Sequence, residues 1–132
     1  MMFILDTCAL IYDALSPERL SKRAEAAIEK GDEQGELACS DISLWEIAML
    51  IGRGRLDPGT DALAFIRLLL AARRLQVIGI TPEIAVISSD AKLFIHADPA
   101  DRIIAATALT YKAPLITCDG HLAKVKGLSV LW

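Results

Sequence analysis

The sequence contains few of the residues that bind zinc or form disulfide bridges. Among its 132 residues there are only two histidines and three cysteines. Cys8, Cys39 and Cys118 are odd in number and show no Cys-x-x-Cys spacing, which argues against a disulfide framework and a zinc knuckle. We expect them to be small buried hydrophobic residues. A metal site in this chain would therefore have to use carboxylate oxygens.

The chain also lacks a membrane-spanning segment and an excess of positive charge. Its apolar content is 54%, but Arg67, Arg73 and Arg74 interrupt the longest apolar stretches. No run reaches the roughly 18 apolar residues of a spanning helix. The first residues reach Asp6 without a basic region, unlike a signal peptide, so we expect a cytoplasmic protein without a membrane partner. The net charge of −3 argues against binding nucleic acid through bulk positive charge alone.

Short apolar runs alternate with helical patterns along the chain. We expect helices where a Ser, Thr or Asp cap or a Pro opens an apolar pattern, at residues 16–31, 40–52, 60–74, 81–92 and 98–111. We expect strands at residues 2–5, 36–39, 76–80, 115–118 and, at one edge, 128–131. This alternation predicts an α/β fold in one domain spanning residues 1–132. Its sheet should be parallel, with four to five strands and helices on both faces.

Two acidic residues follow strands of this expected sheet directly. Asp6 comes after the first strand, and Asp119 comes after the strand that ends at Cys118. In parallel sheets, sites form beyond the carboxyl ends of the strands, so both side chains are expected at one edge. Each also has an ordinary structural interpretation. Asp6 could cap the following turn, and Asp119, which precedes Gly120, could be a turn residue.

Further acids lie in two of the expected helices. Glu46 stands in an apolar stretch, where an acid is costly unless it is paired; alternatively it is an exposed acid on the polar face with Ser43. Ser40, Ser43 and Glu46 follow one another at three-residue spacing and form a polar strip. Asp98 and Asp101 flank the start of another helix, and capping together with the helix dipole would explain both. We assign the cap to Asp98 and expect Asp101 to point toward the edge of the sheet.

Asp6, Glu46, Asp101 and Asp119 together form a set of oxygen donors suited to a hard cation. Mg²⁺ takes oxygen ligands, keeps several waters and is usually held by only a few carboxylates. Clustered carboxylates repel one another and take up protons when no cation lies between them. The sequence therefore predicts a metal site at these four residues.

Four segments, in order along the whole chain, carry a family resemblance. They are Phe3-Ile4-Leu5-Asp6-Thr7, Ser40-x-x-Ser43-Leu44-Trp45-Glu46-Ile47-Ala48, His96-x-Asp98-Pro99-x-Asp101-Arg102-Ile103-Ile104-Ala105-Ala106-Thr107-Ala108 and Leu115-Ile116-Thr117-Cys118-Asp119. The combination resembles the PIN domain, and within that family the VapC-type toxins of bacterial and archaeal toxin-antitoxin pairs. The resemblance implies an endoribonuclease that depends on Mg²⁺ or Mn²⁺, cleaves RNA as a toxin and is neutralised by a VapB-type antitoxin.

The resemblance also implies roles for individual residues. Asp6, Glu46, Asp101 and Asp119 match the acidic quartet of the family, which would make them catalytic residues and metal ligands. Thr7, Asp98 and Thr117 would support them. Members of the family commonly form homodimers, and the expected helix at 60–74 is apolar nearly all the way round. That helix would bury surface against a second subunit or the antitoxin.

Two other functions compete with this interpretation. A phosphatase could use Asp6 as a covalent nucleophile. Phosphatases of the haloacid-dehalogenase type carry a second Asp two residues later, where this chain has Cys8. A non-catalytic PIN-like binding module would have lost one or more of the four acids, and all four are present here.

Overall fold

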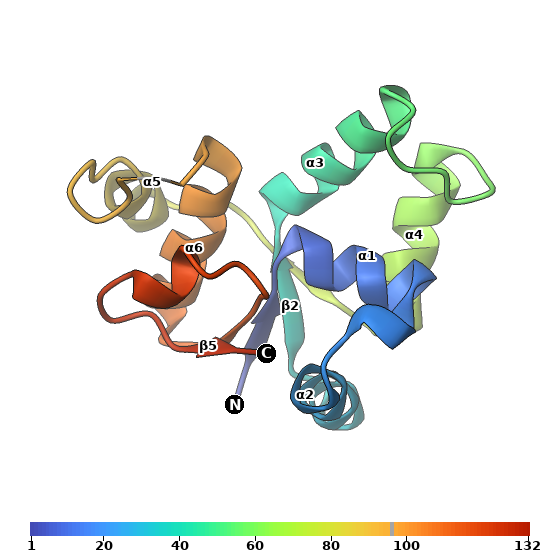
Figure 1. The fold of residues 1–132 in the computed structure, drawn as a ribbon, viewed down its shortest axis with the longest axis horizontal. Helices are drawn as coiled ribbons and strands as arrows, with labels where there is room; N and C mark the ends of the chain where they lie inside the picture. Colours follow the sequence, from blue (N-terminus) through green and yellow to red (C-terminus); the bar gives the residue numbers. More distant parts are fainter. Residues whose placement is uncertain (96) are drawn as a thin grey trace.

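A five-stranded sheet forms the centre of the structure, a computed structural model that describes residues 1–95 and 97–132 (Figure 1). Its strands are β1 (Phe3–Leu5), β2 (Leu37–Ser40), β3 (Gln76–Ile78), β4 (Leu115–Ile116) and β5 (Val130–Leu131). Every neighbouring pair is parallel, in the order β3-β2-β1-β4-β5. The predicted α/β fold with a parallel sheet is thereby confirmed.

Helices cover both faces of the sheet (Figure 1). In the described part of the chain the α-helices are α1 (Thr7–Leu15), α2 (Lys22–Gln34), α3 (Asp41–Gly52), α4 (Ala62–Ala72), α5 (Pro82–Ser88) and α6 (Pro99–Tyr111). Two short 3-10 helices are η1 (Pro17–Arg19) and η2 (Leu122–Lys124). None of the helices formed by the described residues has the length and apolar content needed to cross a membrane.

The side chains of β1 alternate between two hydrophobic cores. Phe3 and Leu5 pack with the buried residues of α1, α2, α3 and α4. Ile4, which lies between them, packs with the buried residues of α5 and α6. A strand that is buried on both faces needs a continuous apolar sequence, which explains the run before Asp6.

The boundaries near the N-terminus differ from the prediction. Residues 7–15 form α1, which the sequence analysis did not predict, and the expected helix at 16–31 is divided into η1 and α2. The oxygen Oδ1 of Asp6 accepts a hydrogen bond from the amide of Ala9 at 2.8 Å and so caps α1. Ser21 caps α2 in the same way, whereas the side chain of Ser16 makes no capping bond. The helix break therefore lies at Leu20-Ser21.

Gly31 does not end α2, contrary to the prediction. The helix continues to Gln34 and ends at Gly35, whose φ of 67° lies in the left-handed region that favours glycine. A Cβ atom at Gly31 would lie 2.4 Å from the side chain of Leu37. Gly31 is thus needed because the helix packs closely on β2, not because the chain turns there.

Several other elements are shorter than expected. The strands β3, β4 and β5 end or begin two residues inside the predicted ranges, and α5 ends at Ser88 rather than near Lys92. The predicted start of α6 is confirmed, since Asp98 is its N-cap and Pro99 its first residue. Polar side chains stand at or directly after the ends of three strands, at Asp6, Ser40 and Thr117.

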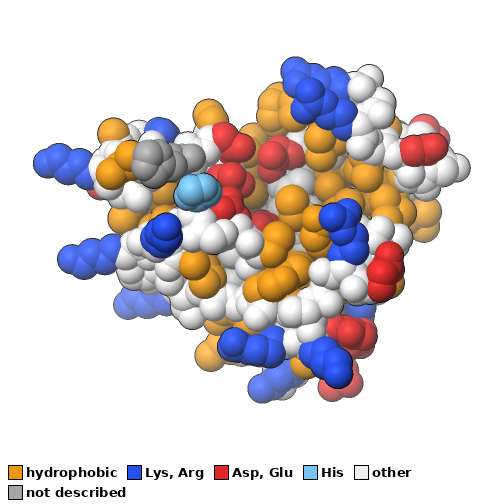
Figure 2. Space-filling view, viewed as in Figure 1, with side chains coloured by type: hydrophobic (Ala, Val, Ile, Leu, Met, Phe, Trp, Pro, Cys, Tyr) orange, Lys and Arg blue, Asp and Glu red, His pale blue; other side chains and the backbone are white. Residues whose placement is uncertain are grey.

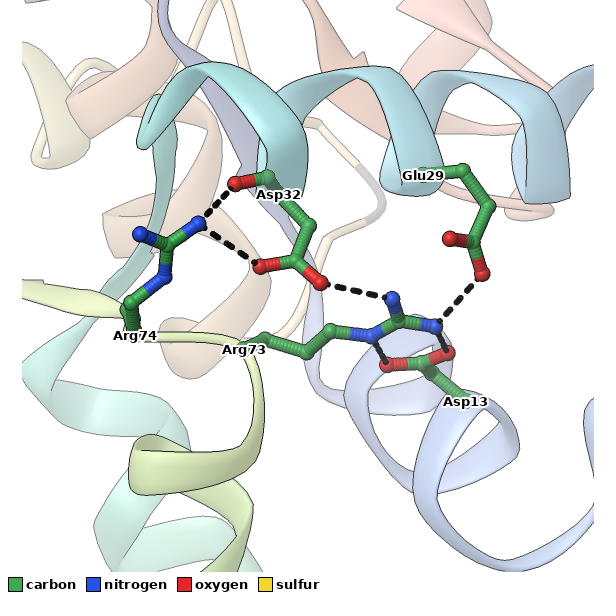
Figure 3. A network of polar contacts seen from close by, with 5 residues as sticks. All are labelled: Asp13, Glu29, Asp32, Arg73 and Arg74. Atoms are coloured by element: carbon green, nitrogen blue, oxygen red, sulfur yellow. Dashed lines mark hydrogen bonds and ion pairs between the residues drawn. The ribbon is translucent and has the colours of Figure 1, made fainter.

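An ion-pair network joins α1, α2 and the end of α4 (Figure 3). The guanidinium of Arg73 donates two hydrogen bonds to Asp13, at 2.9 and 3.0 Å. It also bonds Glu29 and Asp32, each at 3.0 Å. Arg74 donates to the backbone carbonyl of Asp32. One arginine therefore fixes three helices relative to one another on the side of the sheet opposite α5 and α6.

Candidate active site

The strand order places a topological switch point between β1 and β4. The chain passes from β1 to β2 on one side and later returns to place β4 on the other side of β1. Such a switch point is where α/β sheets bind ligands. Leu5 pairs in register with Ile116, so the segments after both residues leave the sheet side by side. These segments carry Asp6, Thr117 and Asp119.

Asp6 is the most deeply buried acid of the site, with 6% of its surface exposed. Burial raises the pKa of its carboxyl, and the nearby Asp119 raises it further. Hydrogen bonds from Thr117 and from the amide of Ala9 act in the opposite direction. The capping interpretation of Asp6 is therefore correct for one oxygen, while the residue also lies at the predicted site.

Thr117 links Asp6 to Asp119. Its side chain is buried, it hydrogen-bonds the Asp6 carboxylate, and its Oγ1 accepts the amide of Asp119 at 3.0 Å. Asp119 in turn accepts the amide of His121 at 2.8 Å, as the turn interpretation expected. One hydroxyl thus positions the acids that follow two neighbouring strands.

Thr7 holds Glu46 from the first turn of α1. Its buried hydroxyl donates to Oε1 of Glu46 and lies 3.0 Å from Oγ of Ser43. Because Thr7 has only one hydroxyl proton, donation to Glu46 leaves its oxygen to accept from Ser43. The sequence analysis placed Ser43 in a polar strip with Glu46 but assigned it no role. The three-residue spacing along α3 places Ser43 and Glu46 on one face of the helix, and the fold brings Thr7 to both of them.

The start of α6 brings two acids to the site. Oδ1 of Asp98 accepts the amide of Asp101 at 2.8 Å, which confirms Asp98 as the cap. Burial raises the pKa of Asp101 to about 7, and the negative charges of Asp98, Asp119, Glu46 and Asp6 contribute to the rise. Burial also raises the pKa of Glu46, with smaller contributions from Asp98 and Asp6 and an opposing hydrogen bond from Thr7. Acids from four separate segments therefore lie close enough to influence one another.

These carboxylates belong to a face where acidic side chains gather. Figure 2 shows Asp and Glu side chains clustered at the centre of the view, between the α3 and α6 sides of the molecule. Two thiols share this region, since the negative charge of Asp6 affects both Cys8 and Cys118. The prediction that all cysteines are buried is wrong for these two, which are exposed, and correct for Cys39. They follow strand ends, where side chains emerge from the sheet.

The donor chemistry fits a hard divalent cation. Carboxylate oxygens of Asp6, Glu46, Asp101 and Asp119 are available, and burial without a counter-charge raises the pKa of the first three. No three His, Cys, Asp or Glu side chains within residues 1–95 and 97–132 are already arranged as ligands of one ion. Mg²⁺ keeps several waters and needs only one or two direct carboxylates, which suits an open cluster of this kind.

Comparison with known proteins identifies the family. Residues 3–128 match the PIN domain. Ribonuclease VapC22 of Mycobacterium tuberculosis is 34% identical over 119 residues, which cover 90% of this chain and 88% of the relative. The chain therefore belongs to the PIN-domain family. Within that family it is a VapC-type ribonuclease, and the phosphatase interpretation of Asp6 is left without support.

Solved structures share the whole fold. VapBC2 from Rickettsia felis, bound to a DNA fragment from its promoter, has a TM-score of 0.77 at 16% identity and covers 98% of this chain and 97% of its own. DNA-bound VapBC from Salmonella typhimurium has a TM-score of 0.76 at 18% identity, with coverages of 98% and 96%. FitAcB from Neisseria gonorrhoeae gives 0.65 at 25% identity, also with coverages of 98% and 96%.

Proposed function

We propose that this chain hydrolyses RNA phosphodiester bonds with Mg²⁺, or Mn²⁺ in its place, held by Asp6, Glu46, Asp101 and Asp119. Thr7, Asp98 and Thr117 support these acids. One observation carries the proposal: the half-buried carboxyl of Asp101 is affected by the negative charges of Asp6 after β1, Glu46 on α3 and Asp119 after β4. Bringing these charges together is costly without a cation.

Asp6 and Asp101 are the strongest candidates for direct metal ligands. Asp6 is held by two hydrogen bonds after β1, and Asp101 lies in the first turn of α6, close enough for the charge of Asp6 to act on it. Glu46, fixed by Thr7, either binds metal or orients the attacking water. Asp119 completes the site directly or through water. A divalent ion bound here would neutralise the scissile phosphate and lower the pKa of a bound water.

Metal removal should abolish the proposed activity. Incubation of the purified chain with single-stranded and structured RNA should give cleavage with Mg²⁺ or Mn²⁺ and none with excess chelator. Adding back Mg²⁺ should restore it, because the four acids of the cluster carry no positive charge to neutralise the scissile phosphate. Equal cleavage with and without chelator would refute the metal mechanism. No cleavage of any RNA under all these conditions would instead favour the non-catalytic binding module.

We further propose that the chain acts as the toxin of a toxin-antitoxin pair and forms a homodimer. The solved structures that share its fold include VapBC and FitAB assemblies. A groove of about 310 Å³ lies between α1 and α4, with Leu10, Phe65 and Leu69 in its lining. Leu68 at its rim is 65% exposed. This groove would receive apolar side chains of the antitoxin.

Leu68→Glu should weaken antitoxin binding, because it places a charge in an apolar contact. Co-expression with a VapB-type antitoxin that co-purifies with the parent chain, followed by affinity purification, measures the effect. Val86→Glu on α5 is the matched control, since Val86 is 70% exposed and lies on the other side of the sheet. Equal recovery of the partner with both variants would exclude the groove.

Light scattering of the chain alone tests the homodimer, and a monomer at tens of micromolar would contradict it.

A further inference from the structure

A cavity of about 390 Å³ lies beside the acidic cluster and takes no part in the site described above. Its walls come from the segment between α5 and α6 and from η2 and its flanking residues. The described lining residues are Lys92, Leu93, Phe94, Ile95, Ala97, His121, Lys124 and Val125. This volume is within the range of pockets that bind small ligands.

Two lining residues of this cavity are close in the chain to acids of the candidate site. Ala97 immediately precedes Asp98, and Nε of Arg102 donates to the carbonyl of Ala97 at 2.9 Å, which fixes that wall. His121 lies two residues after Asp119, and its amide donates to the Asp119 carboxylate. A polymer with one phosphate at the acidic cluster would therefore continue past one of these walls.

The charge of the cavity is opposite to that of the acidic cluster. Its described lining contains Lys92 and Lys124 and no Asp or Glu. Figure 2 shows basic side chains on the α5–α6 half of the molecule, next to the central group of acids. The cavity also has an apolar wall, to which Ile95 contributes although its side chain is 69% exposed. Cationic groups beside an apolar surface suit a nucleotide, which carries a phosphate and a base with an apolar face.

We propose that this cavity binds a nucleotide of the RNA strand adjacent to the scissile phosphate, with Lys92 and Lys124 contacting backbone phosphate. The proposal rests on the proposed ribonuclease function and extends it to the path of the substrate. A chain with a net charge of −3 repels RNA over much of its surface, so local cations must guide the strand. The two lysines supply this charge without lying among the metal-binding acids.

The test replaces both lysines with neutral residues of similar length. Lys92→Gln/Lys124→Gln is compared with Lys22→Gln/Lys30→Gln, which removes the same charge from exposed positions on α2. The probe is a fluorescein-labelled single-stranded RNA of mixed sequence, and binding is followed by anisotropy in chelator over a series of salt concentrations. Each phosphate contact to single-stranded nucleic acid contributes about 0.7 to the slope of log K against log salt, so the cavity variant should lose about 1.4. The α2 variant should keep nearly the full slope.

Measuring RNA binding and RNA cleavage separately distinguishes a failure of the cavity proposal from a failure of the metal mechanism. Lys92→Arg/Lys124→Arg should restore most of the binding, because arginine keeps the charge and the phosphate contact. Equal losses in the cavity and α2 variants, or no loss in either, would overturn the proposal even if cleavage depends on metal. Cleavage that persists in chelator would refute the metal mechanism while leaving a cavity-specific loss of binding intact. Melting curves of each variant confirm that the compared proteins are folded.

Discussion

Asp101→Asn is expected to reduce RNA cleavage by more than about 100-fold. Changes in residues that only support metal ligands already cost 10- to 100-fold, and Asp101 is assigned as a ligand itself. Asp98→Ala should retain part of the activity and lower the melting temperature in metal-free buffer, since losing a cap costs about 1 kcal/mol. Asp98→Asn keeps a capping oxygen and serves as the control. Full cleavage by Asp101→Asn would reduce Asp101 to a residue that merely favours the start of α6.

Asp101→Asn should also change how the stability of the metal-free chain depends on pH. The pKa of Asp101 is about 7 in the folded chain against an ordinary value of 3.8. The folded state therefore holds its proton more tightly than the unfolded state does. The stability that this proton contributes is fully present below pH 3.8 and is lost as the pH rises through 7. Metal-free melting curves should show a smaller loss over this range for Asp101→Asn than for the parent chain.

Arg73→Met is expected to cause the largest loss of stability among these substitutions outside the active site. Arg73 bonds acids on α1 and α2, and its side chain is 22% exposed while that of Asp13 is 12% exposed (Figure 3). The substitution leaves Asp13 partly buried without its partner. Charged hydrogen bonds of this kind contribute about 1.5–3 kcal/mol, and solvent screening puts the expected loss near the lower end.

Two related substitutions show whether the geometry of Arg73 matters. Arg73→Lys should recover part of the stability, because lysine restores the charge but not the paired hydrogen bonds to Asp13. Glu29→Gln should have a smaller effect, since the side chain of Glu29 is 56% exposed. Urea unfolding of the metal-free proteins measures all three. A midpoint for Arg73→Met equal to that of Glu29→Gln would show that the network does not hold the helices together.

Features encoded in short segments were predictable from the sequence. The start of α6 is set by Asp98 and Pro99, and both act within one turn of the chain. The apolar run before Asp6 indicated a strand buried on both faces. In contrast, Gly31 is required by close packing against Leu37, which a linear pattern does not reveal. The missed α1 has a different origin: Asp6 was considered as a cap of the following turn, but residues 7–15 were not assigned to a helix.

The candidate site was likewise predictable from the sequence only in part. The strand pattern placed Asp6 and Asp119 at one edge of the sheet, and the helix pattern drew attention to Glu46 and Asp101. The resemblance to the PIN domain then matched all four to one acidic quartet. The link from Ser43 through Thr7 to Glu46 joins residues far apart in the chain and required the fold. The cavity containing Lys92 and Lys124 likewise joins two segments that are distant in the chain, so it also required the fold.

The central claim is that the carboxylate cluster binds the catalytic metal, and Mn²⁺ titration tests it without depending on activity. Isothermal titration calorimetry of the RNA-free chain should show Mn²⁺ binding that Asp6→Asn and Asp101→Asn each weaken strongly. Asp13→Asn, in the Arg73 network, should bind Mn²⁺ like the parent chain, because Asp13 lies outside the cluster. Unchanged Mn²⁺ binding by both Asp6→Asn and Asp101→Asn would contradict the assignment of this cluster as the metal site.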